Sequence, residues 1–248
     1  MLSLLIALVI GAVAFTTGLV FFDPWSGVFL GLAGLVIPLV LIGRKVLRRL
    51  EAKNKEAEAH ISAQRFDKAI AVFESMRPLG LWFPRLAASM DGQIGVLKYA
   101  AQRDFEGARP YLEKAPAKLW MARGMLAAAH FKKHQYDLME KAFEVAVAKN
   151  KEQGLLWAAY AFCELKRGEK AKALNVLQRG VAALPADARL KAHLASLEKG
   201  KKPKMSAYGA EWYSFHIETP AMAGQGQPKF MPPPDKIGGG KRMRVRRM

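Results

Sequence analysis

The sequence has a single cysteine, Cys163, and residues 1–43 hold a single charged side chain, Asp23. One cysteine excludes an intramolecular disulfide framework and any cysteine-rich zinc or iron–sulfur site. The chain also has no glycine-rich phosphate loop, no Gly-x-Ser-x-Gly motif and no Cys-x-x-Cys motif. His130 and His134 stand four residues apart on a predicted helix, but a zincin motif needs a glutamate where Phe131 stands. We therefore expect no metal site, no cofactor and no enzyme, with both histidines at the surface and Cys163 in the core.

Basic residues are abundant and unevenly distributed. The 248 residues include 39 Lys and Arg against 21 Asp and Glu, which gives a net charge of +18. A hydrophobic content of 51% is too high for a disordered protein. The charge pattern divides the chain into an apolar segment (1–43), a basic juxtamembrane helix (44–60), a helical body (61–199) and a basic tail (200–248).

Two uncharged stretches open the sequence, from Leu2 to Phe22 and from Trp25 to Gly43. About 20 apolar residues in a helix cross the ~30 Å hydrocarbon core of a bilayer. Asp23 and Pro24 between them favour a turn, because proline pushes the preceding residue out of the helical region. The pattern predicts a transmembrane helical hairpin.

Small residues recur four apart in both stretches, as in Ala7-x-x-x-Gly11, Ala14-x-x-x-Gly18 and Gly27-x-x-x-Gly31. Such spacing puts small side chains on one helix face and allows backbones to approach closely. We predict helix packing in the membrane at Gly11, Gly18, Gly27 and Gly31. The alternative is that glycine and alanine are simply common in membrane spans. Pro38 is expected to kink the second helix without ending it.

Four basic residues follow the second stretch: Arg44, Lys45, Arg48 and Arg49. Positive residues at the ends of spans stay in the cytoplasm. They predict an integral membrane protein of the bacterial inner-membrane type, with residues 44–248 in the cytoplasm. An alternative is signal-peptidase cleavage after Ala12-Val13-Ala14. The segment before this site has no Lys or Arg, however, whereas a signal peptide normally has a basic N-terminal region.

The body from Glu51 to Lys199 is rich in Ala, Leu, Lys and Glu and predicts an all-α fold. Four segments share a loop-like or aromatic start, then a small or apolar residue, then an apolar residue four positions later. They are the segments 65–73, 104–112, 135–143 and 169–177. Taking Ala69, Ala108, Met139 and Ala173 as equivalent, the intervals are 39, 31 and 34 residues.

This spacing resembles the tetratricopeptide repeat, whose period is 34 residues. The best copy covers residues 154–187, and three copies are degenerate. The resemblance implies stacked helical pairs that share a core, leave a concave groove and bind protein partners. The predicted repeat core comprises Ala69, Phe73, Ala108, Leu112, Trp157, Ala161, Ala173, Leu177 and Pro185. Trp82 and Phe83 lie in an irregular stretch that packs between repeats or touches the membrane surface.

The tail is rich in glycine and proline and is expected to be mostly disordered. Trp212, Tyr213 and Phe215 form a candidate segment for docking on a partner or on the protein's own groove; the alternative is a local collapsed cluster. A basic run of Lys241, Arg242, Arg244, Arg246 and Arg247 predicts binding to an anionic surface, as do the four basic residues after the second span. The nearby membrane favours lipid or an acidic protein over nucleic acid.

These patterns predict a two-helix transmembrane hairpin, a solenoid similar to tetratricopeptide domains and a disordered basic tail. The expected function is that of a membrane-anchored scaffold or adaptor for protein partners. One alternative is an accessory subunit of a larger membrane complex, of the secretion, pilus or respiratory type, held by its hairpin. Another is a basic membrane tether for nucleic acid or ribosomes.

Overall fold

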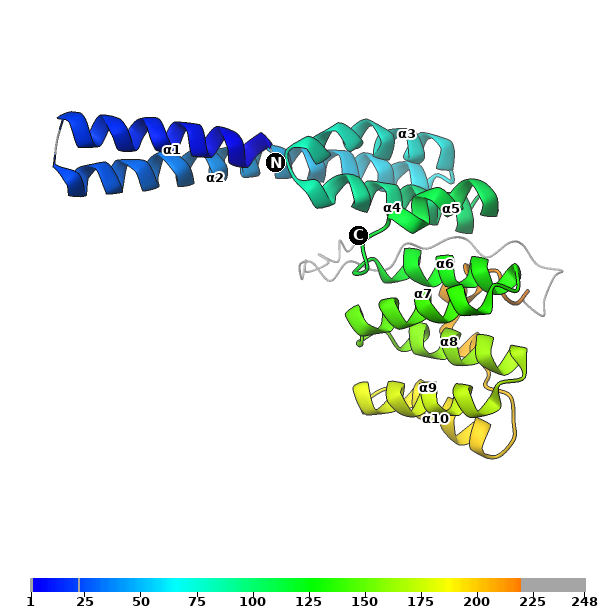
Figure 1. The fold of residues 1–248 in the computed structure, drawn as a ribbon. Coiled ribbons are helices and arrows are strands. Elements are labelled where there is room, and N and C mark those ends of the chain that lie inside the picture. The colour runs from blue at the N-terminus through cyan, green and yellow to red at the C-terminus, as the bar shows by residue number, and fades with distance from the viewer. Residues whose placement is uncertain (1, 22, 220–248) are drawn as a thin grey trace, which may run out of the picture.

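The computed structural model describes residues 2–21 and 23–219 (Figure 1). Within these ranges the chain forms eleven α-helices and two short 3-10 helices, and no strand. The fold is therefore all-α, as the composition of the body predicts.

The apolar start forms an antiparallel hairpin of α1 (Leu2–Phe21) and the first half of α2 (Pro24–Ser62). Asp23 has an extended backbone, and Pro24 occupies the first turn of α2, where its fixed φ fits a helix start. Both helices are long and apolar enough to cross a membrane. Only 17% and 6% of their apolar windows are buried. Their side chains therefore face outward, unlike those of a core helix in a soluble protein.

Helix α2 continues without a break from the hairpin into the body (Figure 1). Its 39 residues correspond to about 58 Å of helix. Pro38 lies inside the helix, which continues past it, and the predicted juxtamembrane helix is the second half of α2. No loop separates the hairpin from the body.

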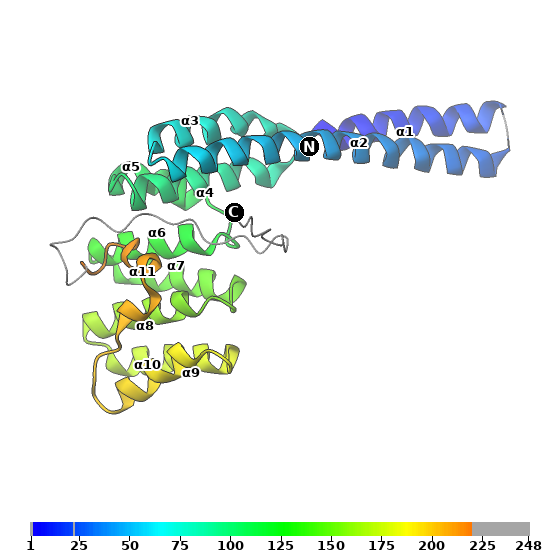
Figure 2. The ribbon, with the colours of Figure 1, turned by 180° about the vertical axis from the view of Figure 1, so that it is seen from behind.

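The body is a stack of antiparallel helical pairs. The end of α2 pairs with α3 (Phe66–Met76), and the 3-10 helix η1 (Arg77–Leu81) leads to α4 (Pro84–Ala100) and α5 (Phe105–Lys114). The next pairs are α6 (Trp120–Lys132) with α7 (Tyr136–Lys149) and α8 (Gly154–Arg167) with α9 (Lys170–Ala183). Helix α10 (Ala188–Glu198) packs on the last pair. The pairs up to α5 continue the line of the hairpin, and α6–α10 extend sideways from it (Figures 1 and 2).

The same turn recurs between the two helices of each pair. The second helices α3, α5, α7 and α9 each begin one residue after the start of a segment that the sequence aligned. The residue five positions before each of the four aligned residues has a positive φ: 56° at Gln64, 57° at Arg103 and His134, and 96° at Gly168. Glycine occupies this left-handed position only in the last copy, where it avoids the strain that a side chain adds. The repeated turn supports the alignment of the four segments.

Eight of the nine predicted core residues are buried: Ala69, Phe73, Ala108, Leu112, Trp157, Ala161, Ala173 and Leu177. Pro185 is exposed, because α9 ends at Ala183 and the proline lies in the turn that follows. This corrects its assignment to the core. The indole of Trp157 donates a hydrogen bond to the carbonyl oxygen of Lys151 at 3.0 Å, and the ring of Phe143 stacks on Tyr160 with centroids 4.9 Å apart.

The chain beyond α10 is ordered as far as the structure describes it. Residues 205–213 form a 3-10 helix, η2 (Met205–Tyr208), and one turn of helix, α11 (Ala210–Tyr213). This corrects the expectation that disorder begins at residue 200. The predicted basic run at 241–247 lies outside the described residues.

Candidate functional site

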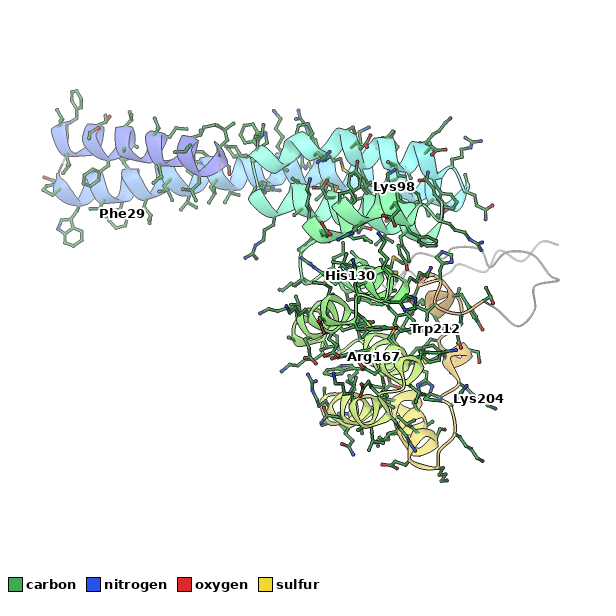
Figure 3. The ribbon with its side chains drawn as sticks, turned by 45° about the vertical axis from the view of Figure 1, so that its right-hand side comes forward. Phe29, Lys98, His130, Arg167, Lys204 and Trp212 are labelled. Atoms are coloured by element: carbon green, nitrogen blue, oxygen red, sulfur yellow. The ribbon has the colours of Figure 1, made fainter. Side chains whose placement is uncertain are left out.

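Residues 200–219, called here the C-terminal segment, run back across the first helices of the pairs (Figure 2). Near its start, the carbonyl oxygen of Lys204 lies 3.2 Å from Nε2 of His193 on α10. Further on, Trp212 packs edge-on against Phe162 of α8, with ring centroids 5.0 Å apart. Figure 3 shows Lys204 and Trp212 on the same side of the stack. The segment thus crosses α10 and then α8.

The segment ends in contact with α6 and α4. A Cβ atom added to Gly124 of α6 would lie 2.6 Å from the ring of Phe215, so the ring occupies the space that this glycine leaves. The hydroxyl of Tyr99 on α4 donates a hydrogen bond to the carbonyl oxygen of Phe215 at 3.0 Å. One stretch of chain therefore joins α10 to the first helices of three pairs, α8, α6 and α4.

Trp212 and Phe215 are fully buried, and Tyr213 is half-buried. This corrects the interpretation of Trp212 and Phe215 as residues that dock on a partner. They pack on the protein's own helices instead, which was the second of the two docking modes expected for this segment. Because the C-terminal segment covers it, the face formed by α6, α8 and α10 is not an open groove in this conformation.

Lys132 lies in an aromatic pocket completed by the C-terminal segment. Its Nζ is 3.7 Å from the ring centroid of Phe105 and 5.5 Å from that of Tyr99. The ring of His216 packs against both aromatic rings. Burial lowers the pKa of Lys132 to about 8, and the positive charge of Arg103 adds to the effect. In a fraction of the molecules the Lys132 amine is therefore neutral at physiological pH.

An ionic cluster joins α7, α8 and α9. Glu140 accepts hydrogen bonds from Arg167 at 2.6 Å and Lys172 at 2.7 Å. The bond from Lys172, followed by that from Arg167, lowers the pKa of Glu140. Glu164 lies beneath them with no exposed surface and no hydrogen bond to either carboxylate oxygen among the described residues. Burial, and then the negative charge of Glu140, raise the pKa of Glu164.

The two histidines that the sequence paired do not converge on one site. Nδ1 of His130 lies 2.8 Å from the side-chain oxygen of Gln135, and Nδ1 of His134 lies 2.8 Å from the hydroxyl of Tyr136. His134 is exposed but His130 is buried, which corrects its expected surface position. Across residues 2–21 and 23–219, no three His, Cys, Asp or Glu side chains are grouped so as to hold a metal ion. Cys163 is a buried free thiol whose pKa is raised by burial.

The four glycines predicted for membrane packing lie on the contacting faces of α1 and α2. A Cβ added to Gly18 would lie 2.5 Å from Cα of Gly27. One added to Gly11 would lie 3.1 Å from the carbonyl oxygen of Gly31. Gly34 also belongs to this interface, where it faces Ala14, and the four-residue pattern missed it. The small residues thus serve packing within the hairpin.

The second helices leave an outer face, defined here as the exposed surface of α5, α7 and α9. On α7 this face carries Leu138 and Val145, which are 42% and 47% exposed. They are seven residues apart and so lie on one side of the helix. The basic residues Arg44, Lys45, Arg48 and Arg49 are exposed on α2, directly after its apolar half.

No protein-family model matches the chain, and a search of curated proteins found no match. The resemblance to the tetratricopeptide repeat therefore depends on the residues and the repeated turn described above.

Proposed function

We propose that this protein is a membrane-anchored scaffold, with a body similar to tetratricopeptide domains, that recruits or assembles protein partners at the cytoplasmic face of a membrane. The observation that carries the proposal is the exposed apolar hairpin, from which α2 runs without interruption into the stack. The basic residues from Arg44 to Arg49 support a cytoplasmic body.

The polar side chains of α1 support insertion into lipid. Thr16 bonds to the carbonyl oxygens of Ala12 and Val13, and Thr17 bonds to that of Val13. Their hydroxyl groups therefore need no water as a partner, which is the condition for a polar group inside a bilayer. The side chain of Phe29 on α2 projects outward, where lipid is the expected neighbour (Figure 3).

The outer face is the recruiting surface that we propose. The C-terminal segment covers the face of α6, α8 and α10, whereas Leu138 and Val145 are exposed on α7. Exposed apolar side chains on one side of a helix are a common basis of protein–protein contacts. The charge of the body adds a preference for acidic partners.

A photo-crosslinking residue at Leu138 or Val145 of the full chain, in its native membrane, tests this function. We expect a discrete crosslinked protein that is absent when the same residue replaces Ala192, which is exposed on α10. The change Leu138→Glu should abolish the Val145 crosslink without altering the thermal unfolding of the body. No crosslink from α7 would contradict a recruiting role for the outer face.

The same experiment distinguishes the scaffold from the alternative of an accessory subunit of a larger membrane complex. A crosslink from Phe29 in the hairpin, without one from α7, would favour a subunit that is held by its spans. The glycine spacing no longer supports that alternative, because Gly18 and Gly27 contact each other within the hairpin.

A further inference from the structure

Exposed apolar side chains gather where the hairpin meets the body. Outside residues 1–43, five large hydrophobic side chains of the described chain are more than about a third exposed. Leu138 and Val145 belong to the outer face. The other three are Leu47 on α2 (53% exposed), Leu81 at the end of η1 (69%) and Phe83 before α4 (37%). Two separate parts of the chain thus expose apolar side chains near the membrane end.

A hydrogen bond fixes the position of residues 81–83 along the axis of the hairpin. The hydroxyl of Ser3, at the start of α1, donates to the carbonyl oxygen of Trp82 at 2.8 Å. The apolar stretch of α1 begins at Leu2, so Trp82 lies level with the end of the span. Figure 1 shows the start of α4 beside the same end of the hairpin. If the hairpin crosses a bilayer, residues 81–83 therefore lie at the boundary between lipid and water.

The alternation of helix direction brings further loops to the same side of the stack. Helix α2 runs away from the hairpin and each following helix reverses direction, so η1 and the loops 115–119, 150–153 and 184–187 all lie toward it (Figure 1). This hairpin-facing edge carries exposed lysines at Lys114, Lys118, Lys149 and Lys151. Exposed Arg85 adds charge beside Phe83. Exposed Glu113 and Glu152 lie at the same edge, but these five basic side chains outnumber them. The edge therefore presents a net positive charge where an anionic leaflet would lie.

From this arrangement we infer that a second membrane contact exists besides the hairpin. Leu47, Leu81 and Phe83 enter the interface of the cytoplasmic leaflet, and the lysines of the hairpin-facing edge lie over anionic headgroups. Aromatic and apolar side chains flanked by basic ones are the usual composition of such interfacial contacts. The stack of α6–α10 then extends along the membrane rather than away from it. The inference rests on the proposed membrane hairpin.

Spin-label depth measurements on the full chain in nanodiscs test the apolar part. In a Cys163→Ser background, single cysteines replace Phe29, Leu81 or Leu138, and the accessibility of each label to oxygen and to a water-soluble nickel complex is compared. We expect the Leu81 label at the interface, the Phe29 label in the hydrocarbon and the Leu138 label in water. A Leu81 label as exposed to nickel as the Leu138 label, with the Phe29 label still in hydrocarbon, would overturn the inference alone. A Phe29 label in water would overturn the hairpin as well.

Lipid charge tests the basic part. A label at Ala148, beside Lys149, is broadened by a nickel-chelating lipid only when the edge lies close to the headgroups. We expect stronger broadening in a mixture of phosphatidylcholine and phosphatidylglycerol than in phosphatidylcholine alone. The combined changes Lys118→Gln, Lys149→Gln and Lys151→Gln should remove the difference.

A matched variant controls for net charge. Lys170→Gln, Lys199→Gln and Lys201→Gln remove the same charge from exposed positions at the opposite edge of the stack. This variant should keep the dependence on phosphatidylglycerol. Equal broadening in both lipid compositions, or equal effects of the two triple variants, would overturn the basic contact.

Discussion

Replacing Trp212 with alanine should release the C-terminal segment while leaving the helical pairs folded. The indole is fully buried against Phe162, and its Nε1 lies 3.2 Å from a carboxylate oxygen of Glu218. Truncating a fully buried tryptophan to alanine costs about 3–5 kcal/mol. At about 1.4 kcal/mol per tenfold change, this shifts the equilibrium toward the released segment by about a hundredfold to a few thousandfold.

Hydrogen exchange of the full chain, read by mass spectrometry, measures this shift. Amides of residues 205–217 should lose protection by that factor, while the helical amides of α7 and α9 keep theirs. The matched control is Tyr213→Ala, because Tyr213 is the next residue of α11 but only half-buried. Its effect should be at least tenfold smaller.

The reasoning fails if Trp212→Ala leaves exchange in residues 205–217 within twofold of the parent chain, since the segment would then not depend on this contact. It also fails if the variant and the Tyr213 control behave alike. A loss of protection throughout α6–α10 would mean that the segment is required for the pairs to fold, and not merely laid over them.

Five further predictions concern charge, packing and backbone. The raised pKa of Glu164 gives stability that is present below its unfolded-state pKa and is lost as pH rises through the folded-state pKa. Glu164→Gln should therefore raise the melting temperature at pH 7, because it replaces the buried carboxyl group by a neutral amide. Glu140→Gln should have the opposite effect, since the lowered pKa of Glu140 gives stability that is present at neutral pH and is lost on acidification; melting curves between pH 4 and 8 measure both. Gly18→Leu should separate the hairpin helices and lower the melting temperature in detergent, whereas Val20→Leu, at a 75% exposed position, should not. Gly168→Ala should cost about 1–2 kcal/mol from backbone strain alone in denaturant unfolding, because φ is 96° and an added Cβ would contact nothing within 4 Å. Pulsed acylation of Lys132 should reach half its maximal rate near pH 8, and a midpoint at 10.5, the ordinary lysine value, would show that the aromatic pocket does not desolvate the amine.

Local features of the sequence were sufficient to predict much of the architecture. The absence of charge and the Asp23-Pro24 turn give the hairpin, because helix length and hydrophobicity are local properties. The alignment on Ala69, Ala108, Met139 and Ala173 locates the second helix of every pair to within one residue. That success follows from packing: each of these positions needs a residue that fits a buried helix contact.

The position of the C-terminal segment was not predictable in the same way. Its glycine and proline content suggests disorder, but its stability comes from a surface made by helices that are distant in sequence. Phe215 fits beside Gly124, which is 91 residues earlier, and no periodic pattern links the two. The contact between Trp82 and Ser3 depends in the same way on the pairing of α1 with α2. Local sequence patterns do not reveal such a contact between distant residues.

The course of the C-terminal segment also bears on how the chain folds. A solenoid in which each repeat contacts only its neighbours can unfold one repeat at a time from an end. Here residues 204–216 bond to α10 and α4, so the C-terminal segment closes a loop around the intervening helices. Fraying of α10 therefore competes with contacts on α4 and α6, which makes unfolding more cooperative than nearest-neighbour stacking allows. During synthesis, the buried face of α6 and α8 remains uncovered until residue 217 has left the ribosome.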